Sequence, residues 1–184
     1  MYPTLPALSL ARFHCSLALV ACYLLWTAPA WAQGEKPRVP VPVIFDTDMG
    51  GDCDDVGALF ILHGAVERGE ARLLATMGCV SADAIAPALD AINTWFGRPK
   101  TPVGTLKDTG FLAGPHYTTE LAKRFPHQFA AGMDYPDAVE LYRQILSQQP
   151  DGSVVIVAVG PLRNLATCLS PPQTKPARWM VAHS

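Results

Sequence analysis

The sequence has no cluster of basic residues and no cysteine spacing typical of a zinc site. Its 14 Lys and Arg residues and 16 Asp and Glu residues give a formal net charge of −2, which does not favour nucleic acid or an anionic membrane as a partner. Of the five cysteines, Cys53, Cys79 and Cys168 follow the N-terminal leader described below. An odd number leaves at least one thiol unpaired in a monomer, and we expect all three to be small buried apolar residues.

A hydrophobic run long enough to span a membrane in the mature protein is also missing. The apolar run from Cys15 to Trp26 is too short for that role, but it has the length of a signal-peptide core. It follows Arg12 and precedes Ala30-Trp31-Ala32, which has the small-x-small pattern of a cleavage site. We therefore expect residues 1–32 to be a signal peptide.

A cleaved leader places the mature protein in the periplasm or the medium, without a stable membrane span. Leu19-Val20-Ala21-Cys22 also has the pattern of a lipoprotein box, so a lipid anchor at Cys22 is the alternative form of export. Residues 33–40 are expected to be a linker, and residues 41–184 to form the folded part.

Strand and helix patterns alternate along the folded part, which predicts an α/β fold with a parallel sheet. The apolar run from Val41 to Phe45 is typical of a strand that is buried on both faces. The other expected strands are residues 72–77, 101–104 and 154–159. The expected helices are residues 55–68, 82–96, 118–124 and 136–148, and a last helix that ends near Cys168.

The first expected helix, residues 55–68, has Val56, Leu59, Phe60 and Leu62 on its buried side, and His63 is expected to be an ordinary helix residue. The segment from Lys107 to Tyr135 is rich in Gly, Pro and His and is expected to be a surface insertion or lid. Near the C-terminus, only Trp179 to Ala182 has the pattern of a further strand. The sheet is therefore expected to be incomplete at the C-terminus, as in the N-terminal part of a larger domain.

The main chemical signal is the acidic loop, residues 46–55, which directly follows the first strand. Five carboxylates fall in this stretch, and so many like charges raise one another's pKa values unless a positive charge lies among them. A hard divalent cation such as Ca²⁺ or Mg²⁺ is the natural partner, because it prefers oxygen ligands. Aspartates near a helix N-terminus are also favourable without a metal, so Asp54 and Asp55 have a second interpretation as helix-terminal residues.

Two other acidic motifs fit less well. An EF-hand loop that begins at Asp46 requires a Glu at the position occupied by Gly57. The stretch Phe45-Asp46-Thr47-Asp48 is similar to the nucleophile motif of aspartyl-nucleophile phosphatases, but Gly50 stands at its Thr or Val position. A phosphatase of this type remains the weaker alternative.

Three segments together resemble the inosine/uridine-preferring nucleoside hydrolase family. DTDMGGDCDDVGAL, residues 46–59, is similar to its N-terminal signature, and residues 72–104 are similar to the strand, helix and strand that follow. VVIVAVGPLRNLA, residues 154–166, resembles its strand-GPLTNLA segment. The resemblance implies a Rossmann-like sheet, a bound Ca²⁺ ion and hydrolysis of the N-glycosidic bond of a ribonucleoside or a related N-ribosyl compound.

The resemblance also implies a role for each residue of the loop. Asp48 matches the residue that ligates calcium and deprotonates the attacking water, and Asp55 matches a second calcium ligand. Asp54 matches a residue that binds a ribose hydroxyl, and Val159 matches the position whose backbone carbonyl ligates calcium. Asp46 and Asp52 would then lie behind these ligands.

The chain also departs from the family. It carries two additional residues, Asp52-Cys53, in the acidic signature, and it has Cys79 where typical members have a ribose-binding Asn. The family's later metal-binding and ribose-binding residues would lie beyond Ser184. We therefore expect this chain to be a fragment with reduced or no hydrolase activity. A non-catalytic protein that binds calcium or a sugar is the alternative, and self-association and the preferred base stay open.

Overall fold

The computed structural model describes residues 39–82, 84–108, 110–112, 117–128 and 134–170. The predicted signal peptide, most of the predicted linker and the predicted C-terminal strand lie outside the described residues. Within the described part of the chain, no helix is long and apolar enough to cross a membrane.

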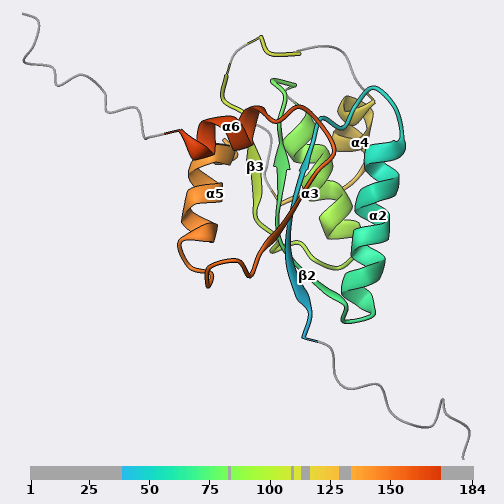
Figure 1. Ribbon diagram of the computed structural model, residues 1–184. Coiled ribbons are helices and arrows are strands. Elements are labelled where there is room, and N and C mark those ends of the chain that lie inside the picture. Colours follow the sequence, from blue (N-terminus) through green and yellow to red (C-terminus); the bar gives the residue numbers. More distant parts are fainter. Residues whose placement is uncertain (1–38, 83, 109, 113–116, 129–133, 171–184) are drawn as a thin grey trace, which may run out of the picture. The chain divides into compact units, whose positions relative to one another are not determined.

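A four-stranded parallel sheet forms the centre of the described structure (Figure 1). This confirms the predicted α/β, Rossmann-like class with a parallel sheet and flanking helices. The strands lie in the order β3-β2-β1-β4, so the order reverses between β1 and β4, and sheets of this type bind ligands beyond the carboxyl ends of the strands at such a point. The strand bounds are β1 Val41–Thr47, β2 Ala71–Gly78, β3 Val103–Thr105 and β4 Val155–Ala158.

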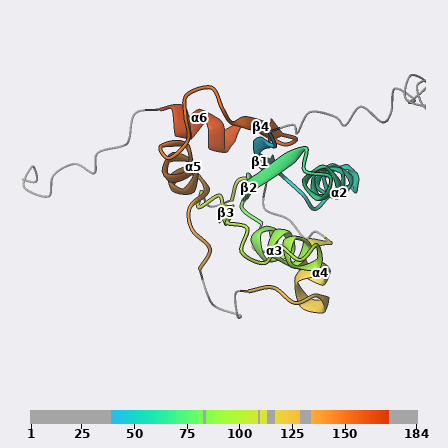
Figure 2. The same ribbon diagram turned by 90° about the horizontal axis from the view of Figure 1, so that it is seen from below.

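Helices cover both faces of the sheet. Figure 2 shows α2, α3 and α4 on one side and α5 and α6 on the other. Every helix expected from the sequence is present, with ends that differ by a few residues. The bounds are α2 Asp54–Glu67, α3 Ile85–Trp95, α4 Thr118–Arg124, α5 Ala138–Leu146 and α6 Arg163–Leu169.

β1 is the most buried strand because both of its faces are covered. Consecutive side chains of a strand point to opposite faces. Phe45 packs into the core beneath α2 and α3, together with Leu59 and Leu89, whereas Ile44 packs into the core beneath α5, together with Tyr142. This double burial explains the uninterrupted apolar run that predicted the strand.

Two helix starts differ from the sequence expectation for identifiable reasons. α3 begins at Ile85 rather than residue 82, which places Pro87 in the first turn, where its missing N–H is tolerated. α5 begins at Ala138 because the Asp137 carboxylate caps it, accepting hydrogen bonds from the amides of Val139 (2.8 Å) and Glu140 (3.0 Å).

The buried side of α2 also differs from the prediction. Phe60 was expected to be buried but is 44% exposed, whereas His63 is fully buried. The His63 ring stacks on Phe96 with a centroid separation of 4.3 Å, and its Nε2 lies 3.0 Å from Asn93 Oδ1. Its Nδ1 lies 3.3 Å from a guanidinium nitrogen of Arg98. The guanidinium can only donate, so this arrangement requires a neutral imidazole that accepts at Nδ1 and donates from Nε2.

We expect this histidine to make the protein less stable in mild acid. Burial, and then the charge of Arg98, lower the pKa of His63 from 6.5 to about 4. Between these pH values the unfolded chain binds a proton that the folded protein does not bind. The free energy of unfolding therefore decreases as the pH falls through this window, by about 1.4 kcal/mol for each pH unit.

Urea denaturation of the wild type and of His63→Gln between pH 4 and pH 7 measures this effect. The wild type should lose stability relative to the variant as the pH falls, because glutamine does not titrate. A difference between the two proteins that stays constant across this range would contradict the prediction.

Candidate metal centre

The acidic loop lies at the carboxyl end of β1, where the strand order reverses. β1 ends at Thr47 and α2 begins at Asp54, so residues 48–53 connect the strand to the helix. Cys79 and Val159, which follow β2 and β4, are hydrogen-bonded to the end of β1. The Cys79 amide donates to the Thr47 carbonyl, and the Val159 amide donates to the Asp46 carbonyl, each at 2.9 Å. The predicted site residues are thus brought to one edge of the sheet.

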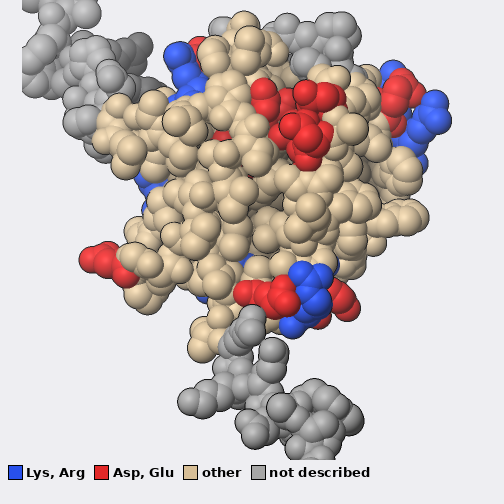
Figure 3. All heavy atoms as spheres, turned by 45° about the vertical axis from the view of Figure 1, so that its right-hand side comes forward, with Lys and Arg blue, Asp and Glu red and all other residues tan. Residues whose placement is uncertain are grey.

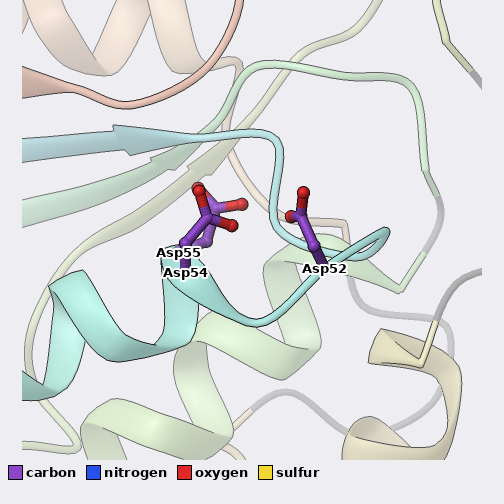
Figure 4. A group of neighbouring side chains, drawn as sticks. All are labelled: Asp52, Asp54 and Asp55. Atoms are coloured by element: carbon purple, nitrogen blue, oxygen red, sulfur yellow. The ribbon is translucent and has the colours of Figure 1, made fainter.

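Asp52, Asp54 and Asp55 form one group that could hold a metal ion (Figure 4). One carboxylate oxygen of each residue lies within 4.8 Å of the others. Asp52 and Asp54 are exposed, whereas Asp55 is only 4% exposed. Of the predicted metal ligands, this group contains Asp55; Asp48 and Val159 lie outside it.

Among the described residues, no basic side chain forms an ion pair with this group. In the described part of the chain, none of the ion pairs involves an aspartate of the acidic loop. Figure 3 likewise shows a patch of acidic atoms near the top of one face with no Lys or Arg atoms among them. A hydrogen bond with Asp54, and then the charge of Asp54, raise the pKa of Asp52, and the same hydrogen bond lowers the pKa of Asp54. Carboxylates this close together could hold a cation.

Asp55 is held in position by Thr47, a contact that the sequence analysis missed. The Thr47 hydroxyl donates to Asp55 Oδ1 at 2.6 Å and accepts a hydrogen bond from the Met49 amide at 3.0 Å. Burial raises the pKa of Asp55, and the charges of other loop aspartates add to this effect. The Thr47 bond opposes the increase, so Thr47 stabilises the charged form of a buried carboxylate.

Asp46 lies behind the loop in the core and is 1% exposed. The Tyr142 hydroxyl (2.9 Å) and the Asn164 side-chain amide (3.0 Å) both donate to its Oδ2. Asn164 also donates to the Gly78 carbonyl at 3.1 Å, so one buried side chain links the ends of β1 and β2. Burial is the main reason that the pKa of Asp46 is raised, and the two hydrogen bonds oppose this increase. Asn164 lies in the GPLRNLA segment, but no local pattern indicated that it would reach Asp46.

Asp48 is half-buried and lies against Gly160, which follows β4. A Cβ atom at position 160 would lie 2.5 Å from Asp48 Oδ1, 2.8 Å from the Asp48 amide nitrogen and 2.8 Å from Cys79 Sγ. Only glycine permits this close approach. The contact places the predicted general base beside the segment that carries Val159, a residue that is 41% exposed.

The burial of the three cysteines agrees only in part with the expectation. All three are free thiols; Cys79 is buried and Cys168 is partly buried, but Cys53 is exposed. The prediction that Cys53 is a buried apolar residue is therefore wrong, because it lies at the N-cap of α2 in the solvent-facing part of the loop. Burial raises the pKa of Cys79 far above its usual range, and the neighbouring charge of Asp46 adds to this increase.

Described residues of the predicted lid contact the loops at this edge of the sheet. Ser81, which follows β2, exchanges backbone and side-chain hydrogen bonds with Phe111 (2.9 and 3.2 Å). Arg163 at the start of α6 pairs with Asp108 and lies over the Phe111 ring, 5.2 Å from its centroid. At the start of α4, the Tyr117 amide donates to the Gly50 carbonyl at 3.4 Å. The segment is thus tied to the loops that follow β1, β2 and β4.

Comparison with known proteins adds no further assignment. Neither the protein-family models nor the curated proteins searched contain a match to this chain.

Gly160→Ala tests whether the approach of Gly160 to Asp48 organises the loop. The added Cβ meets backbone as well as side-chain atoms, so it cannot be accommodated by a side-chain rotation alone. We expect a loss of about 1–3 kcal/mol in the free energy of unfolding, together with weaker binding of a divalent cation. Chemical denaturation and calorimetric cation titration measure the two effects.

Gly57→Ala is the matched control. Gly57 lies inside α2, and a Cβ atom there meets nothing within 4 Å. The control should be as stable as the wild type or more stable by up to about 1 kcal/mol, because alanine favours a helix. Equal behaviour of the two variants would show that Gly160 has no special role.

Proposed function

We propose that this chain binds Ca²⁺ at the acidic loop and belongs to a hydrolase that cleaves the N-glycosidic bond of nucleoside-like substrates. The observation that carries the proposal is the group of Asp52, Asp54 and Asp55 at the reversal point of the sheet, with no basic partner among the described residues. The reaction class rests on the resemblance of residues 46–59 and 154–166 to nucleoside hydrolases.

The residues present have the chemistry that a calcium site requires. Carboxylate and carbonyl oxygens are hard ligands, and the loop offers several of them in one place. Asp48, Asp55 and the Val159 carbonyl are the proposed ligands, and the proximity of Asp52 and Asp54 adds negative charge around them. When bound, calcium would orient sugar hydroxyls and make a water molecule more acidic.

The reaction proposed is the addition of water across the bond between the anomeric carbon and the base. A carboxylate oxygen of Asp48 would accept a proton from the attacking water, while the water oxygen bonds to the anomeric carbon. The electrons of the broken bond leave with the base, which then takes up a proton, and the products are ribose and the free base. Asp54, exposed at the start of α2, would accept a hydrogen bond from a ribose hydroxyl, and Thr47 would keep Asp55 in place.

The burial of Asp46 favours this assignment over the phosphatase alternative. An aspartyl nucleophile must reach its substrate, whereas Asp46 is 1% exposed and one of its oxygens accepts two hydrogen bonds. Asp46 is better suited to stabilising the end of β1, from which the acidic loop extends, through its hydrogen bonds with Tyr142 and Asn164.

Removal of calcium should lower the melting temperature. A ligand that binds only the folded state stabilises it, by about 2.7 kcal/mol at a concentration one hundred times its dissociation constant. Differential scanning calorimetry of protein freed of metal by a chelator, with and without added Ca²⁺, measures this effect. Identical melting curves for the two samples would contradict a calcium site.

Asp48→Asn tests the reaction itself. Incubation of the purified chain with inosine or uridine, followed by chromatography of the free base, should show slow hydrolysis that requires Ca²⁺. Loss of a general base lowers the rate by about a hundredfold or more, so Asp48→Asn should release almost no base. Asp151→Asn, which changes an exposed aspartate after α5, is the control and should keep the wild-type rate. Tight calcium binding without any hydrolysis by the wild type would instead favour the non-catalytic binding protein.

A further inference from the structure

Apolar side chains lie on every side of α2, including its exposed side. No Asp, Glu, Lys or Arg occurs between Asp55 and Glu67. In the middle of the helix, Phe60 is 44% exposed and Ile61 is 73% exposed. A helix with apolar side chains all round is usually covered on all sides. The exposed side of α2 therefore has the composition of a buried surface.

The neighbouring ends of α3 and α4 add two aromatic side chains to this surface. Trp95, the last residue of α3, is 70% exposed, and Phe125, which directly follows α4, is 39% exposed. Their rings are in edge-to-face contact with a centroid separation of 5.9 Å, and Phe60 makes a similar contact with Phe96 at 4.8 Å. These ring contacts hold the aromatic side chains in place at the surface.

Phe60, Trp95 and Phe125 also line a groove between the three helices. Its volume is about 300 Å³, and all the residues that line it are apolar, among them Ile92 and Leu121. Sites for small molecules combine an apolar lining with a few polar groups that orient the ligand, whereas aromatic residues are enriched at protein interfaces. A groove lined by apolar residues alone is therefore more typical of a contact with a protein.

The four exposed residues, Phe60, Ile61, Trp95 and Phe125, form an apolar patch of the size that a protein interface needs. With about 200 Å² for each fully exposed side chain, their exposed fractions correspond to about 450 Å². A standard interface buries about 800 Å² on each partner, of which about half to two thirds is apolar. The patch could therefore supply the whole apolar part of such an interface. Figure 3, which brings the side of α2 forward, shows uncharged surface between the acidic atoms near the top and a charged group near the bottom.

The shape of this surface favours a second copy of the chain as the partner. Ile61 projects from α2 beside the groove, and on the same side of the helix its neighbours are Gly57 and Gly64, which have no side chain to cover it. A two-fold axis through the patch would place Ile61 of each copy in the groove of the other. The groove is large enough, since a cavity of about 150 Å³ holds benzene. A projecting side chain and a groove on one surface are what a self-complementary contact requires.

We propose that two copies of this chain associate through the apolar patch, with Ile61 of each copy in the groove of the other. This contact would cover Phe60, which the apolar pattern of α2 predicted to be buried. The inference does not depend on the proposed function, because no residue of the patch belongs to the acidic loop.

Ile61→Lys tests the inference, since it places a charge in the patch without changing a core residue. Sedimentation velocity at increasing protein concentration should show a monomer–dimer equilibrium for the wild type. The substitution occurs twice in a symmetric dimer, so the dissociation constant should rise about a hundredfold or more. At a concentration where both proteins are monomeric, their circular dichroism spectra and melting temperatures should agree, because Ile61 is exposed in the monomer.

Two further variants show whether the effect is specific to this surface. Trp95→Gln removes apolar area from the patch without adding a charge and should weaken the dimer about tenfold or more. Leu169→Lys is the matched control, because Leu169 is 87% exposed on α6, on the other side of the sheet. It should leave the dissociation constant unchanged.

A wild type that stays monomeric at every concentration would overturn the inference. Binding of the dye anilinonaphthalene sulfonate to that monomer, lost in Trp95→Gln, would then assign the groove to a small apolar ligand instead. The inference would also be overturned by a dimer that persists unchanged in both Ile61→Lys and Trp95→Gln, or by one that Leu169→Lys weakens as strongly.

Discussion

Asp46 is a buried carboxylate, and the hydrogen bonds that it accepts connect several elements around the site. A buried carboxylate without partners is unfavourable by several kcal/mol, so it must be satisfied from nearby elements. Tyr142 on α5 and Asn164 on α6 supply those bonds, and both helices lie on the same face of the sheet. The Asp46 backbone also accepts from Val159, which fixes the end of β4 beside the end of β1.

The position of the acidic loop follows from this arrangement. Once α6 is held at Asp46, the turn that precedes it passes so close to Asp48 that only glycine fits at position 160. On the other side, Thr47 links the end of β1 to the first turn of α2 through Asp55. The loop is therefore held at both ends by uncharged donors, while its carboxylates have no basic partner in the described structure. This gathering of carboxylates could hold a metal ion.

Asp54 and Asp55 can be interpreted as helix-terminal residues and as members of a metal site, and the two interpretations do not exclude each other. Asp54 and Asp55 lie in the first turn of α2, where the helix dipole favours negative charge. Neither caps the helix, because the N-cap residue is Cys53 and makes no side-chain cap bond. The dipole reduces the repulsion between the two aspartates, but Asp52 precedes the helix and is exposed, and its interaction with Asp54 raises its pKa. Helix placement thus explains part of the pattern, and the same group of carboxylates could hold a metal ion.

The sequence by itself determined the succession of strands and helices along the chain, the parallel class of the sheet and the position of the acidic loop directly after the first strand. These follow from local patterns, namely apolar runs and amphipathic periods. Only the tertiary structure decided which carboxylate has which environment. The glycines interrupt the strand period after Thr47, so sequence spacing could not show that Asp46 is buried, Asp55 is bonded to Thr47 and Asp52 faces solvent. Contacts of Asn164, Gly160 and Tyr117 join elements far apart in the chain, and such contacts depend on packing rather than on local pattern.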